Sequence, residues 1–149
     1  SGAGDLAGEA FRIGQDRRQR RGAGPFRDHL GTLDEQGDGH SRLSLAVAPA
    51  HLNPHRVVHG AVLYALADTG MGSALYPSLA EGEICATIEI KINYFKPVSA
   101  GTLNCITQVV NRGRTVANLE SRLFLGDTLV ALANGNYAIF TPRTRTGGA

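Results

Sequence analysis

The sequence predicts an α+β fold in which an antiparallel sheet of about five strands wraps around one long central helix. Residues 59–76 are apolar nearly all round, carry a single charge at Asp68 and are followed by Pro77. A helix of that character must be buried on most sides. Alternating segments joined by short turns follow it, and such successions form antiparallel sheets. The sheet is therefore expected to curl around the helix.

The composition is that of one globular domain. The chain has 149 residues, of which 42% are hydrophobic and 19% charged, which fits a single domain with its own core. No apolar run approaches the roughly 18 residues of a membrane span, and the first residues lack the apolar stretch of a signal peptide. Cys85 and Cys105 are too few for a disulfide framework or a zinc site. We therefore predict thiols in a cytoplasmic protein without a metal or other cofactor.

The positive charge is concentrated at the N-terminus. Residues 1–27 hold six arginines against three acidic residues, a net +3, whereas residues 28–149 hold nine basic and ten acidic residues, a net −1. The body is therefore not expected to bind nucleic acid. We assign residues 1–39 to an N-terminal extension that is part helical and carries the basic run, residues 40–142 to the folded domain, and residues 143–149 to a polar tail.

The elements follow one another in a simple order. Residues 35–39 have the composition of a turn, and residues 40–48 alternate as a strand does. Residues 49–55 contain two prolines, which exclude a continuous helix there. Within the predicted helix, Gly70 and Gly72 each cost roughly 1 kcal/mol relative to alanine. They predict the close approach of a strand, a partner chain or a ligand.

Four further strands are expected after the helix. Residues 84–94 alternate with Ile88, Ile90 and Ile92 on one side, which would place Thr87 on the other side, facing outward if the isoleucines cover the helix. Residues 102–110 and 115–125 are expected to pair through a hairpin at residues 111–114. Gly126-Asp127 then favours a tight turn into a last strand, which spans residues 128–140.

One pattern of residues resembles a known family. Asn53, the dipeptide His59-Gly60 and Asp68 occur in the spacing Asn-x5-His-Gly-Ala-x6-Asp-Thr, and residues 92–97 read Ile-Asn-Tyr-Phe-Lys-Pro. With the order of elements, this resembles the hotdog-fold acyl-CoA thioesterases of the phenylacetic-acid-degradation type over residues 40–140. The family more often has glycine where Ala61 stands.

The resemblance implies both an assembly and a chemistry. It implies a long helix wrapped by five or more strands, and homodimers or homotetramers with active sites between subunits. It also implies hydrolysis of acyl-CoA thioesters without a metal. From the charge distribution and the lack of a long apolar run, no nucleic-acid or membrane partner is expected.

Asp68 is the strongest candidate for a catalytic residue. A carboxylate within an apolar helix is costly to bury unless it is paired or hydrogen-bonded. Small residues and one tyrosine lie within helical reach of it, including Ala61 and Tyr64, which we regard as substrate-binding candidates. Asp68 would act as a general base on water or as a nucleophile. The alternative is an aspartate that is capped or paired at a subunit interface.

The start of the helix is the second candidate site. Free N–H groups at Gly60, supported by the helix dipole, could polarise a thioester carbonyl, although this glycine could also serve only the entry into the helix. The resemblance gives His59 a structural or substrate-contacting role more than a chemical one. His51, His55 and His59 are spaced for a metal on a helix, but Pro54 breaks that helix and no metal is expected.

The other candidate residues have weaker support. The resemblance places Asn53 at the thioester carbonyl and Thr87 at the attacking water. Asn53 could instead make an Asx turn, and Thr87 could be an ordinary strand residue. Arg112 and Arg114 flank a turn glycine and could bind the phosphates of coenzyme A, although exposed turn arginines are common.

Two other functions remain possible at this level. An acyl-CoA hydratase of the same fold is disfavoured because no histidine follows Asp68. A non-catalytic acyl-CoA-binding module, or an inactive family member, is the alternative to an enzyme. The identity of the acyl group is not determined by the sequence.

Overall fold

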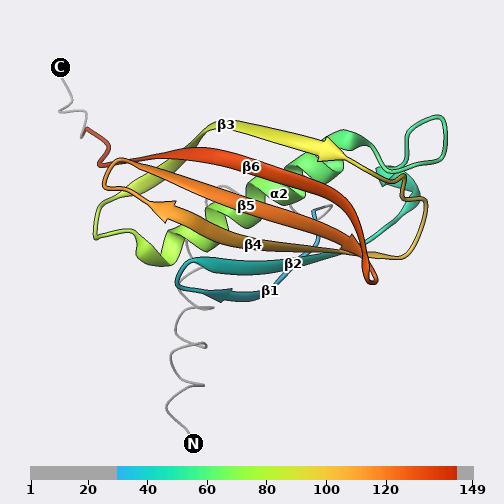
Figure 1. The fold of residues 1–149 in the computed structure, drawn as a ribbon, viewed down its shortest axis with the longest axis horizontal. Coiled ribbons are helices and arrows are strands. Elements are labelled where there is room, and N and C mark those ends of the chain that lie inside the picture. Colours follow the sequence, from blue (N-terminus) through green and yellow to red (C-terminus); the bar gives the residue numbers. More distant parts are fainter. Residues whose placement is uncertain (1–29, 144–149) are drawn as a thin grey trace, which may run out of the picture.

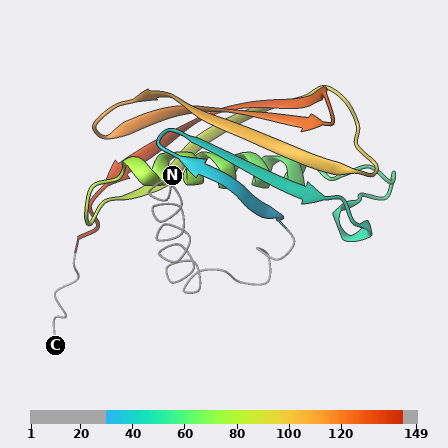
Figure 2. The ribbon, with the colours of Figure 1, turned by 90° about the horizontal axis from the view of Figure 1, so that it is seen from below.

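The computed structural model describes residues 30–143, and the predicted helix and basic run of the N-terminal extension lie outside them. Among the described residues, one antiparallel sheet wraps around one long helix (Figures 1 and 2). The spatial order of its six strands is β1-β2-β4-β5-β6-β3. The strands are β1 Thr32–Gly37, β2 His40–Ala46, β3 Ile84–Tyr94, β4 Thr102–Arg112, β5 Val116–Leu125 and β6 Thr128–Phe140. The helix is α2, Gly60–Leu75, and two short 3-10 turns are η2, Pro49–His51, and η3, Tyr76–Ser78.

The predicted architecture is confirmed, with one strand more than expected. Residues 35–39 were predicted to form a turn, but β1 continues to Gly37 and pairs with β2. The pairing shifts between Leu33 and Glu35, so Asp34 is the extra residue of a bulge. This short strand has no alternating apolar pattern, which is why the sequence did not indicate it. The sheet therefore begins within the segment that the sequence assigned to an extension.

The helix buries one face rather than its whole circumference in this single chain. Its buried residues face the sheet and are Leu63, Leu66, Ala67, Gly70, Met71, Ala74 and Leu75. Ala61 and Thr69 are exposed on the other side, and Tyr64, Ala65 and Asp68 are half-buried there. The apolar sequence predicted that the helix is buried on most sides. A second surface would have to pack against the exposed side of α2 to complete that burial.

Buried side chains of the sheet hold the helix at a fixed position along its axis. Ser41 Oγ donates a hydrogen bond of 2.6 Å to the carbonyl oxygen of Gly70, and Ser121 Oγ donates one of 3.4 Å to that of Ala67. A Cβ added at Gly70 would lie 2.6 Å from Thr107 Oγ1, which explains the glycine. Gly72 has nothing within 4 Å of that position, so the predicted close approach is found in this chain only at Gly70.

Strand β3 lies at one edge of the sheet and contains a bulge. Thr87 pairs with Tyr137 and Glu89 pairs with Asn136, so Ile88 has no partner in the β6 ladder. The bulge breaks the alternation: Ile88 is 56% exposed, while Ile90 packs against the core. The prediction that Ile88 shares a side with Ile90 is therefore wrong, and so is the outward direction predicted for Thr87.

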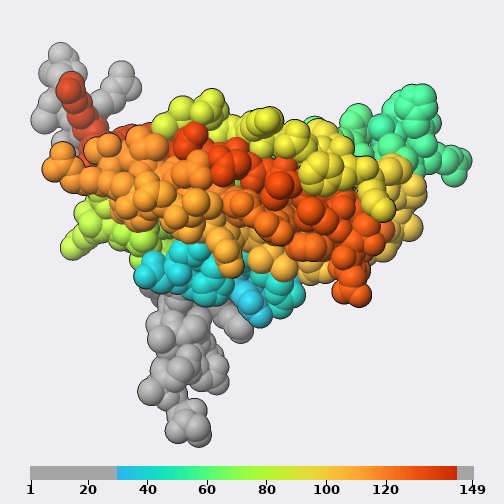
Figure 3. Space-filling model, in the orientation of Figure 1, coloured from blue at the N-terminus to red at the C-terminus, as the bar shows by residue number. Residues whose placement is uncertain are grey.

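The sheet covers α2 from one side only. The space-filling view shows its outer face, running from β3 at the top to β1 and β2 at the bottom (Figure 3). Large apolar residues are exposed on edge strand β3 and on the outer sheet face, namely Ile84, Ile88, Ile106, Val110, Val116 and Phe140. No helix among the described residues is long and apolar enough to cross a membrane.

Candidate active site

Asp68 is held by hydrogen bonds from two neighbouring strands. Thr87 Oγ1, on β3, donates to Asp68 Oδ1 at 2.7 Å. The hydroxyl of Tyr137, on β6, lies 2.8 Å from the backbone oxygen of Asp68 and also contacts Oδ1. Thr87 and Tyr137 are direct partners in the ladder between β3 and β6. The sheet therefore presents two hydroxyl groups to one carboxylate oxygen.

The second oxygen of Asp68 is available for chemistry. Oδ2 makes no hydrogen bond with any described residue. Among the described residues, Asp34 Oδ2 is the single buried side-chain oxygen or nitrogen without a hydrogen-bond partner, so Asp68 Oδ2, which also has none, is not a buried atom. Asp68 Oδ2 is therefore accessible from outside. A carboxylate with one oxygen fixed and the other accessible is the arrangement expected of a general base or a nucleophile.

Tyr137 was not among the predicted site residues. Its side chain is only 3% exposed. Burial, reinforced by the hydrogen bond to Asp68, raises the pKa of Tyr137 far above its usual range, so the phenol stays protonated. Alternation along residues 128–140 places Tyr137 on the helix-facing side. A phenol among buried residues there needs a polar partner, and this signal could have pointed to Asp68.

Cys85 also lies close to this carboxylate. It is half-buried on the edge strand, and burial is the main cause that raises the pKa of its thiol, with a smaller contribution from the charge of Asp68. Cys105 lies on the other side of the helix, in the core, where burial raises its pKa to about 11. Both cysteines are free and are in the thiol form at neutral pH.

The N-terminus of α2 presents unused backbone donors. Gly60 and Ala61 donate no backbone hydrogen bond to described residues, and His59 provides no side-chain cap. Tyr94 lies over this end: its hydroxyl donates to the carbonyl oxygen of Gly60 at 2.8 Å. A Cβ at Gly60 would lie 3.1 Å from the Tyr94 ring, so the space for a side chain is restricted. These N–H groups form a small site for a carbonyl oxygen or an anion.

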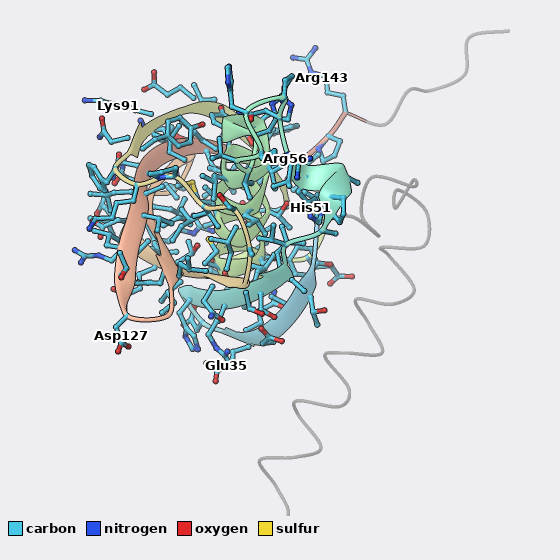
Figure 4. All side chains as sticks on the ribbon, turned by 90° about the vertical axis from the view of Figure 1, so that its right-hand side faces the viewer. Glu35, His51, Arg56, Lys91, Asp127 and Arg143 are labelled. Atoms are coloured by element: carbon cyan, nitrogen blue, oxygen red, sulfur yellow. The ribbon has the colours of Figure 1, made fainter. Side chains whose placement is uncertain are left out.

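Asn53 forms the Asx turn that was one of its two predicted roles. Its Oδ1 accepts hydrogen bonds from the N–H groups of His55, at 2.9 Å, and Val57, at 3.3 Å. The turn holds a loop in which Arg56 has a positive φ of 62°; Figure 4 labels Arg56 and His51 in this region. Asn53 Nδ2 makes no hydrogen bond with described residues and is the atom that a ligand could use.

The three histidines of this region do not form a metal site. His51 is buried, and its Nδ1 accepts a hydrogen bond of 2.8 Å from the N–H of Ala48. His55 and His59 are exposed in the loop and at the helix start. Across residues 30–143 no group of three or more histidine, cysteine, aspartate or glutamate side chains could hold a metal ion.

The two arginines predicted to bind phosphate occupy different environments. Arg112 ends β4 instead of lying in a loop, and its guanidinium donates to Ser78 Oγ at 3.1 Å and to Ser78 O at 3.2 Å. It also lies 3.8 Å from Glu83 Oε1. Arg114 is exposed in the turn and makes no hydrogen bond or ion pair with the described residues. Arg112 thus fixes the segment after the helix, and only Arg114 is free to meet a ligand.

Within one chain, Asp68 and the helix N-terminus are two separate candidate half-sites. Eight residues separate Gly60 from Asp68, which corresponds to about 12 Å along a helix. A reacting carbonyl carbon must approach a nucleophile to roughly 3–3.5 Å. A single thioester group therefore cannot contact both half-sites of the same chain.

Comparisons with known proteins identify the family. Residues 55–132, just over half of the chain, match the family model of the thioesterase superfamily. The chain belongs to this superfamily. A protein of Archaeoglobus fulgidus named "Putative esterase" is 31% identical over 103 residues, 68% of this chain. That match spans 65% of the Archaeoglobus protein, slightly less than two thirds of its length.

Other relatives and solved structures agree with this family. A protein of Pseudomonas aeruginosa that is also named a "Putative esterase" is 30% identical over 114 residues. The match covers 74% of this chain and 85% of that protein. The structure of a variant of the phenylacetic acid degradation protein PaaI from Thermus thermophilus superimposes with a TM-score of 0.71 at 27% identity, covering 77% of this chain and 98% of that one. A conserved protein of Pseudomonas aeruginosa gives 0.72 at 30% identity, covering 78% and 94%. The predicted resemblance to hotdog-fold thioesterases of this type is confirmed.

Proposed function

We propose that this protein hydrolyses acyl-CoA thioesters to a free acid and coenzyme A, with Asp68 as the reacting carboxylate. The observation that carries the proposal is the state of Asp68: one oxygen is held by two hydroxyl groups and the other is accessible. A buried structural aspartate would have both oxygens satisfied. Membership of the thioesterase superfamily supports a thioester as the substrate.

The reaction can proceed by two routes from this geometry. As a general base, Asp68 Oδ2 takes a proton from water while the water oxygen attacks the thioester carbonyl carbon. The tetrahedral intermediate then expels the thiolate, which is protonated to coenzyme A. As a nucleophile, Oδ2 attacks the carbon itself, the thiolate leaves, and water hydrolyses the resulting anhydride. In both routes, the N–H of Gly60 stabilises the negative charge that develops on the carbonyl oxygen.

A complete site in this proposal requires two copies of the chain. Because Gly60 and Asp68 of one chain lie about 12 Å apart along the helix, the proposal pairs Asp68 of one copy with Gly60 of another. The edge of β3 supports this, because a strand that pairs with β6 on one side only and exposes Ile84 and Ile88 is a template for pairing with a second chain. The small residues on the uncovered side of α2 allow close approach. We therefore propose a homodimer, which could pair further into a homotetramer.

Other residues take supporting roles in the proposed complex. His59, Ala61 and Tyr64 lie along the exposed side of the first helical turns and would line the acyl and pantetheine path. Asn53 Nδ2 would donate to the thioester carbonyl. Thr87 would support the attacking water through Asp68, to which it is bonded.

Arg114 would meet the phosphates of coenzyme A, because its charge is not neutralised by described residues. We include a cytoplasmic location in the proposal, because acyl-CoA is the proposed substrate and both cysteines are free thiols.

The experiment that tests this function is a substrate panel with detection of the released thiol. Purified protein is given short, medium, long and aryl acyl-CoA esters, together with oxygen esters of the same acids. Activity on at least one CoA thioester, exceeding that on its oxygen ester, supports the proposal. Tight binding of acyl-CoA without thiol release would instead identify a non-catalytic binding module.

A further inference from the structure

We propose that Tyr137 is a positioning residue that, together with Thr87, occupies Oδ1 of Asp68 and so selects Oδ2 as the reacting oxygen. This inference rests on the proposed function and deepens it. Carboxylate oxygens are chemically equivalent until their surroundings distinguish them. Here two hydroxyl donors meet one oxygen, and none of the described residues bonds to the other.

Tyr137 links the side chain of Asp68 to the backbone of the helix. Its hydroxyl lies within hydrogen-bond reach of both the backbone oxygen and Oδ1 of Asp68. A single group in contact with both atoms fixes the side-chain rotamer relative to the helix axis. The carboxylate is thereby prevented from rotating between its two oxygens, which keeps the reacting atom in one place.

The two donors are supported by rigid parts of the sheet. Tyr137 lies in β6, where it pairs with Ala117 of β5 on one side and with Thr87 of β3 on the other. Its ring is 3% exposed, so core packing restricts its rotation. The bulge at Ile88 lets both Thr87 and Ile90 face the helix, which a regular strand could not do. A positioning group on a central strand is more precise than one on a loop.

The protonation states around Asp68 fit this role. The titratable groups that face it from the sheet are Cys85 on β3 and Tyr137 on β6. Burial raises the pKa of both, so both are neutral at and below neutral pH. Tyr137 therefore remains protonated and able to donate a hydrogen bond to Asp68.

The test compares Tyr137→Phe with the wild-type enzyme. The substitution keeps the buried ring and removes only the donor. A hydrogen bond to a charged group is worth about 1.5–3 kcal/mol, or roughly tenfold to a hundredfold. We expect kcat to fall by about that factor with KM nearly unchanged. The melting temperature is measured on the same variant, which separates a loss of kcat in the folded protein from a loss of folded protein.

Two further variants separate positioning from stability. Thr87→Val removes the other donor to Oδ1, from an exposed position, and should also lower kcat with KM nearly unchanged. Ser121→Ala removes a buried hydroxyl that bonds to Thr107 and to the helix on its other side. It should lower the melting temperature and leave the kcat of the folded protein unchanged. An unchanged kcat in both Tyr137→Phe and Thr87→Val would overturn the inference.

A second readout does not depend on activity. The side-chain carboxyl carbon of Asp68 can be observed by carbon-13 NMR at neutral pH in each variant. Its chemical shift should differ from the wild type in Tyr137→Phe and in Thr87→Val, because each substitution removes a hydrogen-bond donor to this carboxylate. The spectrum of Thr87→Val decides the matter if Tyr137→Phe fails to fold. A chemical shift identical to that of the wild type would refute the positioning role. If the wild type hydrolyses no thioester, the proposed function fails, while these spectra still decide whether Tyr137 contacts the carboxylate in solution.

Discussion

Thr87 on edge strand β3 donates a hydrogen bond of 2.7 Å to Oδ1 of Asp68 on the central helix. The contact joins residues 19 positions apart and ties the edge of the sheet to the middle of the helix. It depends on a bulge at Ile88, because regular alternation from Ile90 would turn Thr87 away. The strand that exposes an unpaired edge thus also supplies part of the candidate site.

The hydroxyl group of Thr87, rather than its shape, should determine activity. Thr87→Ser keeps the donor and should retain activity within a few-fold of the wild type. Thr87→Val keeps the volume and should lower kcat about tenfold or more, in line with a hydrogen bond to a charged group. Steady-state kinetics on one acyl-CoA decide between them. Equal activity of the serine and valine variants would show that this hydrogen bond is dispensable.

Arg112 and Arg114 should respond differently to removal. Arg114→Ala should raise KM for acyl-CoA several-fold but not for an N-acetylcysteamine thioester, which lacks the nucleotide. Arg112→Ala should lower stability by about 1 kcal/mol, because its guanidinium bonds to Ser78 and lies near Glu83. Kinetics on both substrates and urea unfolding measure these effects. If Arg114→Ala affects both substrates equally, this arginine does not contact the nucleotide.

Alkaline pH should destabilise the fold through Cys105. Its pKa is raised from 9.0 to about 11 by burial in the core. The unfolded chain therefore loses the Cys105 proton at a lower pH than the folded chain does. The contribution of the protonated thiol to the free energy of unfolding is intact below pH 9 and is lost as pH rises from about 9 to about 11. Urea unfolding across this range should show a smaller decline for Cys105→Ala than for the wild type. Parallel declines in the two proteins would contradict the assignment.

The edge of β3 should be the main contact between copies. Ile88→Lys places a charge at its exposed bulge and should yield monomers without activity, since a thioester could no longer reach both half-sites. Val110→Lys is the matched control, because Val110 is 60% exposed on β4, away from that edge. It should leave at least a dimer with activity. Light scattering and kinetics test this, and a wild-type monomer of 15.7 kDa that is active would refute the shared site.

The parts of the fold that depend on local pattern could be predicted. The helix is observed at Gly60–Leu75, within the predicted residues 59–76. Its end could be predicted because the apolar run ends at a proline. The tight turn at Gly126-Asp127 was also correctly placed, whereas the hairpin predicted at residues 111–114 is shifted, because β4 continues to Arg112 and β5 begins at Val116. The spacing of Gly60 and Asp68 indicated two functional positions, and the structure shows unused N–H groups at one and an accessible oxygen at the other.

The features that were missed depend on contacts between distant segments. A bulge adds one residue to a ladder, and an alternating pattern cannot show which residue is skipped, so Thr87 was assigned to the wrong side. Tyr137 is 69 residues from Asp68 in the sequence, and no motif connects them. The role of Arg112 depends on Ser78, which the fold brings beside the end of β4. These three residues needed the tertiary structure.

The most decisive variant is Asp68→Asn, which removes the charge and keeps nearly the same volume. If Asp68 is the base, kcat should fall by about 10²–10⁴, the usual contribution of a positioned general base, and further if it is the nucleophile. Binding of a non-hydrolysable CoA thioether should be nearly unchanged, because the carboxylate does not hold the ligand. The melting temperature should hold or rise, since a half-buried charge is removed. Asp127→Asn, in an exposed turn, is the matched control and should change neither quantity.

Measuring kcat and melting temperature on the same protein separates catalysis from structure. An aspartate whose role is to pair elements would, when substituted, lower the melting temperature and reduce activity in proportion to the folded fraction. The side-chain oxygen of asparagine can still accept hydrogen bonds from Thr87 and Tyr137, so both hydrogen bonds to Oδ1 should persist. A stable variant with lost activity is therefore the outcome that the accessible Oδ2 predicts. Full activity in a stably folded Asp68→Asn protein would refute the role of Asp68 in catalysis.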